Sequence, residues 1–326
     1  MIDEVYSTVL SVLNKNNYGY LSPSDFNLFA QQAQLDIFED FFYSYNYQLS
    51  KENVRQSGTG YADIKKGIEE DIAIFSASVI LDQPATTANT ANLYNLPSDY
   101  YFIDKLYFYP TTLFSGVTSA TLPFKLVDTT LNQFTASTIA PNPPIGSLVV
   151  NTSPAGAPAA PMLTCYVTAV DSTSTLSLSA DIFQEVTFLE NYKIYDANNI
   201  TQIDKVEQNK IFNLTSSNLT APTQQFPAYV LEGTTATVYP STINQKGDVS
   251  CQYIRYPKIP NWTYTMVQNT PLYNPLAVDY QDFEVPQDHM PDLINKILQY
   301  AGMQIREKEV YNFGVSEDLA EQQNEK

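Results

Sequence analysis

The chain has 326 residues and a net charge of −18, from 35 acidic against 17 basic residues. Its only arginines are Arg55, Arg255 and Arg306, and its only adjacent basic pair is Lys65-Lys66. A protein that binds phosphate tightly needs clustered cations, so tight nucleic-acid binding is not expected. Charged residues make up only 16% of the chain, and 24 residues are tyrosine. Tyrosine suits wide, partly wet interfaces as well as β-rich cores, so composition leaves both uses open.

The two cysteines, Cys165 and Cys251, are far apart and each lies in a strand-like alternation. Buried free thiols are therefore expected. Met1 is not followed by a charged region and an apolar signal segment, and no apolar run reaches the ~18 residues of a membrane span. These features predict a soluble protein made in a cytoplasm.

Apolar periodicity predicts three helices in the first part of the chain. The first covers residues 2–13, and the third about 61–75. The second begins after Ser22, which is a capping residue followed by Pro23 and an acidic first turn, and continues to about Ser50. Its aromatic face is broader than a lone surface helix needs, so it should be buried on more than one side.

The following region is dominated by strand patterns. Alternating aromatics at 101–109 predict a strand, and residues 163–180 predict a hairpin with its turn at 171–174. From 111 to 184 charged residues are scarce, which indicates a small β domain inserted into the main body. Further strands are expected at 186–195, 201–212, 229–231, 236–239 and 249–256, the last two as an antiparallel pair joined by 240–248.

A final helix is expected from about Asp288 to Glu309, and residues 316–326 form an acidic, Gln-rich tail. The predicted fold class is α+β: a helical bundle of N-terminal helices plus the C-terminal helix, with an antiparallel β region and an inserted small β domain. The expected domains are a helical part at 1–110, the insert at 111–185, strands and the C-terminal helix at 186–312, and a flexible tail at 313–326.

The sequence offers few groups for catalysis. His289 is the only histidine, and its place before Pro291 predicts an exposed turn residue. Consecutive carboxylates at 69–71 point in different directions on a helix, which favours a solvated face paired with Lys66. Asp279, Asp282 and Glu284 lack the pattern of a calcium loop and are interpreted as linker charges. No catalytic residue, cofactor or metal site is predicted.

Several runs of the chain resemble the neck and tail ring proteins of crAss-like phages. They lie at 5–15, 19–38, 253–262, 282–286 and 293–301, and include Leu96-Pro-Ser-Asp-Tyr100, Ala221-Pro-Thr-Gln-Gln-Phe-Pro-Ala-Tyr229 and Val238-Tyr-Pro240. More distantly, the order of elements resembles head-to-tail adaptors of short-tailed phages. The resemblance implies a virion structural protein, made in the bacterial host, that forms a twelve-fold ring below the portal and contacts other neck or tail proteins. DNA would pass through the ring without being tightly bound, and no membrane anchor is expected.

A ring uses a heterologous interface, in which one face of a subunit binds a different face of the next. The aromatic helix at 22–50 and the terminal helix at 288–309 are the expected faces. The predicted interface residues are Phe26, Phe29, Phe38, Phe41, Phe42, Trp262, Ile297, Tyr300 and Ile305. The main rival is a tail-associated receptor- or carbohydrate-binding virion protein that uses the insert as its binding module. A tail-borne wall hydrolase is disfavoured, because no acid–base pair stands in a convincing context.

Overall fold

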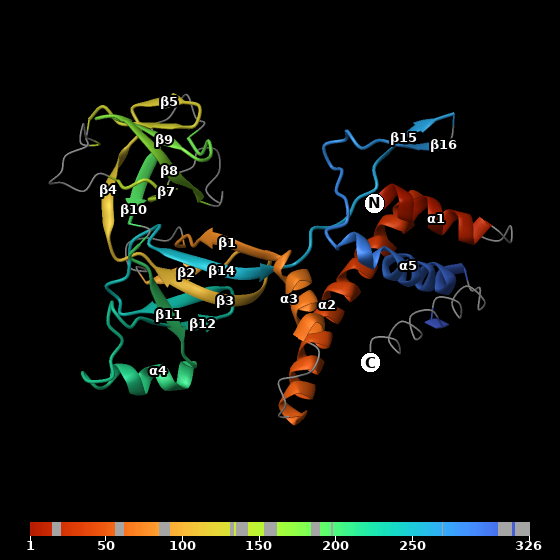
Figure 1. Cartoon of the computed structure of the whole chain (residues 1–326), viewed down its shortest axis with the longest axis horizontal. Helices are drawn as coiled ribbons and strands as arrows, with labels where there is room; N and C mark the ends of the chain where they lie inside the picture. Colours follow the sequence, from red (N-terminus) through yellow and green to blue (C-terminus); the bar gives the residue numbers. More distant parts are fainter. Residues whose placement is uncertain are drawn as a thin grey trace. The chain divides into compact units, whose positions relative to one another are not determined.

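A computed structural model of the protein describes residues 1–14, 21–55, 62–84, 92–130, 134, 143–152, 162–183, 190–196, 198–268, 270–305 and 315–316. These residues contain five named α-helices and sixteen strands, mostly in antiparallel sheets, and the mixed α+β class is confirmed. The chain divides into two compact units, residues 1–75 with 256–326 and residues 76–255. Figure 1 labels most of the elements of each unit.

The first unit is mainly helical. Its helices are α1 (Ile2–Asn14), α2 (Pro23–Arg55), α3 (Ala62–Ala73) and α5 (Met290–Ile305), with a 3-10 turn, η1 (Gln287–His289), before α5. Helix α2 packs against α3 and α5, and α1 packs against α5 (Figure 1). The four predicted helices are therefore present. Helix α2 is indeed covered by more than one neighbour, as its broad apolar face predicts.

Helix starts in this unit are capped by side chains. The Ser22 hydroxyl oxygen accepts the Asp25 backbone N–H at 3.2 Å, which confirms the predicted cap of α2. At α1, Asp282 Oδ1 accepts the Ile2 backbone N–H at 2.8 Å. The interpretation of Asp282 as a linker charge was wrong, because its carboxylate satisfies a helix N-terminus from 280 residues away in sequence.

The second unit contains two seven-stranded sheets among its described residues. The first has the order β1-β14-β3-β11-β12-β13-β2, with only β11 and β12 parallel. Its strands are β1 (Ser76–Ile80), β2 (Leu93–Asn95), β3 (Tyr100–Phe108), β11 (Thr201–Lys205), β12 (Ala228–Glu232), β13 (Thr235–Tyr239) and β14 (Val249–Arg255). Its core includes Tyr94, Leu106, Ile203, Val238 and Cys251.

Two sequence predictions for this sheet were wrong. The strand predicted at 201–212 ends at Lys205, and α4 (Gln208–Thr215) follows, because Ile211 and Leu214, at helical spacing, pack against Ala228 and Val230 of β12. The expected pair of β13 with β14 does not form. Instead β13 pairs with β12 through a tight turn at Gly233, whose φ of +63° suits glycine, and β14 lies between β1 and β3. The shorter connection determines the pairing.

The second sheet has the order β4-β10-β7-β8-β9-β6-β5 and is antiparallel throughout. Its strands are β4 (Thr112–Val117), β5 (Ala120–Leu122), β6 (Lys125–Val127), β7 (Leu148–Asn151), β8 (Leu163–Ser172), β9 (Thr175–Leu178) and β10 (Asn191–Tyr195). The predicted hairpin at 163–180 is present as β8 and β9. Strand β10 covers the end of the predicted 186–195 strand, while 186–189 lie outside the described residues.

A buried polar group lies at the junction of the two sheets. Asp248, just before β14, accepts hydrogen bonds from Lys193 Nζ and the Tyr195 hydroxyl of β10, each at 2.9 Å. Burial raises the pKa of Asp248, while hydrogen bonds and charge from Lys193, and the Tyr195 hydroxyl, oppose this shift. Apolar contacts beside the group, including Ile80 and Leu148, complete the junction. The second unit is therefore joined internally by an ion pair as well as by apolar packing.

Both cysteines are buried free thiols, as the sequence predicts. Cys165 lies in β8 and Cys251 in β14, and burial raises the pKa of each thiol to about 12. The thiols are therefore protonated at neutral pH and poor nucleophiles. Over the helices that the structure describes, none combines the length and apolar character needed to cross a membrane.

Candidate assembly surface

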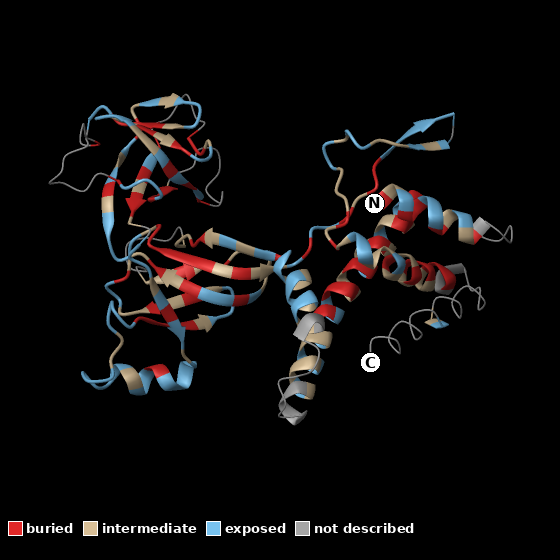
Figure 2. Ribbon diagram, in the orientation of Figure 1, coloured by how far each residue is buried: buried red, intermediate tan, exposed pale blue. Residues whose placement is uncertain are grey.

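A small hairpin in the first unit exposes a set of apolar side chains. Among the described residues, strands β15 (Tyr264–Val267) and β16 (Thr270–Tyr273) pair only with each other (Figure 1). All four residues of β15 are exposed, with Met266 at 61% and Leu272 of β16 at 60% (Figure 2). Leu276 and Val278 follow with almost completely exposed side chains. We call residues 264–278 the arm; the side chains of Met266, Leu272, Leu276 and Val278 are exposed and are not part of the unit's core.

The base of the arm is fixed by aromatic stacking. Trp262 is 2% exposed, and its ring centroid lies 4.1 Å from Tyr6, 5.7 Å from Tyr264 and 5.9 Å from Tyr273. Its indole N–H donates to Asp3 Oδ1 at 3.0 Å. An isolated two-stranded hairpin is marginally stable in water. The stack therefore anchors the first and last paired residues of the hairpin to helix α1.

Two amide side chains of α2 hold the extended chain that leads into and out of the arm. Asn27 Oδ1 accepts the Trp262 backbone N–H at 2.9 Å. Gln34, one heptad later and only 1% exposed, donates to the Lys258 carbonyl oxygen at 2.8 Å and accepts the Glu284 backbone N–H at 3.0 Å. These hydrogen bonds satisfy backbone groups that lie outside the β-strands. They also hold the chain segments at both ends of the arm against α2.

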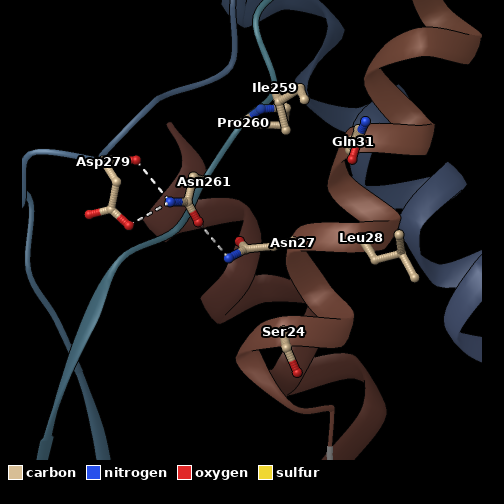
Figure 3. A pocket seen from close by; sticks show the side chains of 8 residues that line it. All are labelled: Ser24, Asn27, Leu28, Gln31, Ile259, Pro260, Asn261 and Asp279. Atoms are coloured by element: carbon tan, nitrogen blue, oxygen red, sulfur yellow. Dashed lines mark hydrogen bonds between the residues drawn. The ribbon is translucent and has the colours of Figure 1, made fainter.

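A shallow pocket of about 440 Å³ lies beside this path (Figure 3). At its centre Asn261 donates to the Asp279 backbone and carboxylate oxygens at 2.8 and 3.1 Å and accepts from Asn27 Nδ2 at 2.8 Å. The exposed side chains of Leu28 and Ile259 line it as well. Asp279 is its only ionisable lining residue and is used structurally. The pocket lining therefore offers no acid–base pair.

A second exposed apolar surface belongs to the other unit. Helix α4 turns Ile211 inward and leaves Phe212 exposed, and the loop after α4 exposes Leu219 and Phe226. The loop is ordered by its own hydrogen bonds, such as the Ala221 N–H to the Ser217 carbonyl oxygen at 2.9 Å. We call residues 211–226 the α4 segment. It and the arm both lack charged residues.

Most of the predicted interface residues lie in the interior of the first unit. Five of them are buried: Phe26, Phe38, Phe41, Trp262 and Ile297. Phe29 and Tyr300 are half-buried and stack at 6.2 Å, and Phe42 lies edge-on to Phe38 at 5.1 Å. The side chain of Ile305 is outside the described part. Packing within one chain accounts for these residues, and their role between subunits stays a prediction.

His289 does not occupy the exposed position that the sequence predicts. It is half-buried in η1, with Nδ1 3.0 Å from Asp292 and Nε2 3.4 Å from Asp71 of α3. Its ring lies edge-on to Phe41 at 4.9 Å. The hydrogen bond to Asp292, followed by the one to Asp71, raises the pKa of His289 although burial lowers it. Lys66 pairs with Glu70 as predicted. Asp71, which was expected on the same solvated face, instead contacts His289.

The His289 contacts predict a pH-dependent stability of the helical unit. Because the folded-state pKa is raised, the stabilisation is complete below the ordinary value of 6.5 and is lost as pH rises through the folded value. Wild-type protein should lose about 0.5–1 kcal/mol between about pH 6 and pH 9, as two partly exposed pairs weaken. Urea denaturation at both pH values measures this loss. His289→Phe keeps a ring against Phe41 and should remove this part of the pH dependence; an unchanged dependence would contradict the assignment.

No group of three or more potential metal ligands is found among the described residues. The arm was missed by sequence reasoning, which treated residues between Trp262 and the last helix as a connection. Its signals were the short Tyr264–Val267 alternation and the lack of charge from Thr263 to Val278. No known protein-family model matches the chain, and the search of curated proteins finds no match.

Proposed function

We propose that the protein is a virion structural protein, a ring-forming head-to-tail connector subunit between portal and tail that lines or surrounds the DNA channel. The observation that carries the proposal is the anchored, charge-free arm. Its exposed apolar residues contribute little to the unit's own core, yet Trp262 and Asn27 hold its base in place. Such exposed apolar surface on an ordered element is typical of protein–protein contact sites.

The fold fits this proposal in two further respects. The packing of α2 with α3 and α5, and of α1 with α5, supports a helical bundle as the connector body. The strands from 112 to 195 make a sheet of their own, which supports an inserted β domain that reaches a neighbouring ring or tail component. The net charge of −18 gives a surface past which DNA slides without sticking.

Single-particle imaging of the full-length protein with its portal tests the function. Closed rings docked coaxially on the portal are the expected result, and the twelve-fold order implied by the resemblance is read from the same images. The protein alone is imaged in parallel, because connector subunits can require the portal as a template. A protein that ignores the portal would overturn the proposal.

The rival function, a receptor- or carbohydrate-binding virion protein, is favoured by one feature of the second sheet. Phe124, in the tight turn between β5 and β6, has a φ of +57° and an exposed ring, and Tyr166 of β8 is exposed as well. A bulky residue at positive φ is strained, and exposed aromatic rings suit sugar stacking. Glycan binding by the full chain that disappears in Phe124→Gly, with the fold unchanged, would support the rival.

A further inference from the structure

From the two uncharged exposed surfaces we infer that the arm of one copy of this chain docks on the α4 segment of a second copy. The inference rests on the proposed ring function and names its subunit contact. The sequence predicted α2 and α5 as the two faces of this contact. The inference instead assigns the contact to two surfaces that are exposed in the single chain. The arm presents Met266 and Leu272, and the α4 segment presents Phe212 and Phe226.

Charge points to a second copy as the partner. Each chain carries −18, so two copies repel wherever their acidic surfaces approach. Residues 263–278 and 211–231 contain no charged residue at all. Contact between these two segments keeps charge out of the interface core, where charged residues are generally depleted. A basic partner would gain nothing from selecting the uncharged parts of so acidic a chain.

The arm and the α4 segment also meet the geometric need of a ring. A heterologous contact requires two different surfaces on each subunit, one donating and one accepting. The arm is a projecting hairpin anchored at its base by Trp262, whereas the α4 segment is a helix with an ordered loop held on β12 by Ile211. The two surfaces belong to separate units of the chain, so each subunit has both to offer.

The interface must also be large enough. A stable interface buries roughly 800 Å² on each partner, more than a four-pair hairpin alone provides. Leu28 and Ile259, which line the pocket beside the path of the arm, add two more exposed apolar side chains. On the accepting side, Phe212, Leu219 and Phe226 supply three large side chains that are at least 70% exposed. Clusters of such residues are the usual energetic centres of interfaces.

Two double variants of the full chain separate the surfaces. Met266→Asp with Leu272→Asp alters the arm, and Phe212→Asp with Phe226→Asp alters the α4 segment. All four positions are exposed, so each variant should keep the wild-type circular dichroism spectrum. The matched control, Ile145→Asp with Ile200→Asp, adds the same charge at exposed apolar positions outside both surfaces.

Self-association is measured by analytical ultracentrifugation, and by imaging on the portal if the free protein needs a template. Each surface variant should weaken association at least about 30-fold, while the control weakens it only slightly. Added salt should strengthen wild-type association, because it screens the repulsion between acidic copies. The decisive sample is an equal mixture of the two surface variants. Only one good contact can form in it, so it should give one-to-one dimers and no rings.

Three results would overturn the inference. Either surface variant could assemble like wild type, the mixture could stay monomeric, or wild-type subunits could dock on the portal without touching one another. The first two leave the proposed function standing, because docking of wild-type rings on the portal is scored separately, whereas the third also contradicts a ring. An α4-segment variant that assembles like wild type would point to arm–arm contact. Failure of wild type to bind the portal counts against the function and not against the contact.

Discussion

A Lys193→Met variant is expected to lose about 3–5 kcal/mol of unfolding free energy in the unit that contains the two large sheets. Lys193 Nζ lies 2.9 Å from Asp248 Oδ1, and Asp248 is only 8% exposed. Methionine fills similar space but leaves the carboxylate buried without a cationic partner. The Tyr195 hydroxyl, also at 2.9 Å, is one neutral donor and does not replace the lysine. Urea denaturation followed by circular dichroism measures the loss.

The pH dependence of this loss identifies its cause. Burial raises the pKa of Asp248, so the folded state binds its proton more tightly than the unfolded state. Stability therefore falls as pH rises from the ordinary value of 3.8 through the folded value, and then levels. Removing Lys193 raises the folded pKa further and extends this fall to higher pH. The variant should thus lose little at about pH 4 and most at about pH 7.

The control for this prediction is the double variant Lys193→Met with Asp248→Asn. The amide is neutral and still accepts from Tyr195, so part of the stability should return. Hydrogen exchange at the amides of β10 and β14 locates the effect at the junction of the sheets. A loss below about 1 kcal/mol for Lys193→Met alone, as for a surface pair, would show that water reaches the carboxylate.

Trp262→Ala is expected to cost about 3–5 kcal/mol in the helical unit, because it removes a large side chain from the base of the arm. The variant loses stacking with Tyr6, Tyr264 and Tyr273 together with the hydrogen bond to Asp3. Trp262 is the only tryptophan, so unfolding is followed by circular dichroism rather than by its fluorescence. The arm itself should become sensitive to proteolysis near Met266.

Trp262→Phe is the matched control, since it keeps one aromatic ring while it removes the indole donor to Asp3 and the second, fused ring. Its expected cost is about 1–2 kcal/mol, from one lost hydrogen bond and a small loss of buried volume. Protection of the arm against proteolysis should be retained. If Trp262→Ala and Trp262→Phe have equal, small effects, the stack does not hold the arm and the assembly surface loses its anchor.

The features predicted correctly from sequence are those with a local cause. The Ser22 cap needs only the next three residues, and the β8–β9 hairpin needs only alternating side chains around a polar turn. Periodicity likewise predicts α1 and α5. The predicted partner of β13 was wrong because β13 is connected by a turn to a strand on each side, β12 and β14. Strand patterns alone do not show with which of the two it pairs.

The candidate site shows the same division. The lack of charge at 263–278 is visible in the sequence, but whether those side chains are buried is not. Aromatic residues such as Phe38 and Trp262 were predicted at an interface because hydrophobicity alone does not separate a core from a contact surface. The structure buries them and exposes Met266 and Leu272 instead.

The sequence by itself determined the acidic charge, the α+β class, the buried thiols and helices α1, α2, α3 and α5, because these depend on composition and on neighbours within a few turns. Only the tertiary structure decided the strand order, the pairing of Lys193 with Asp248, the placement of His289 against Asp71, and the exposure of the arm. Each of these depends on residues that are brought together or left uncovered by the fold of distant segments. Local sequence patterns do not show which distant segment of the chain will pack against a given element.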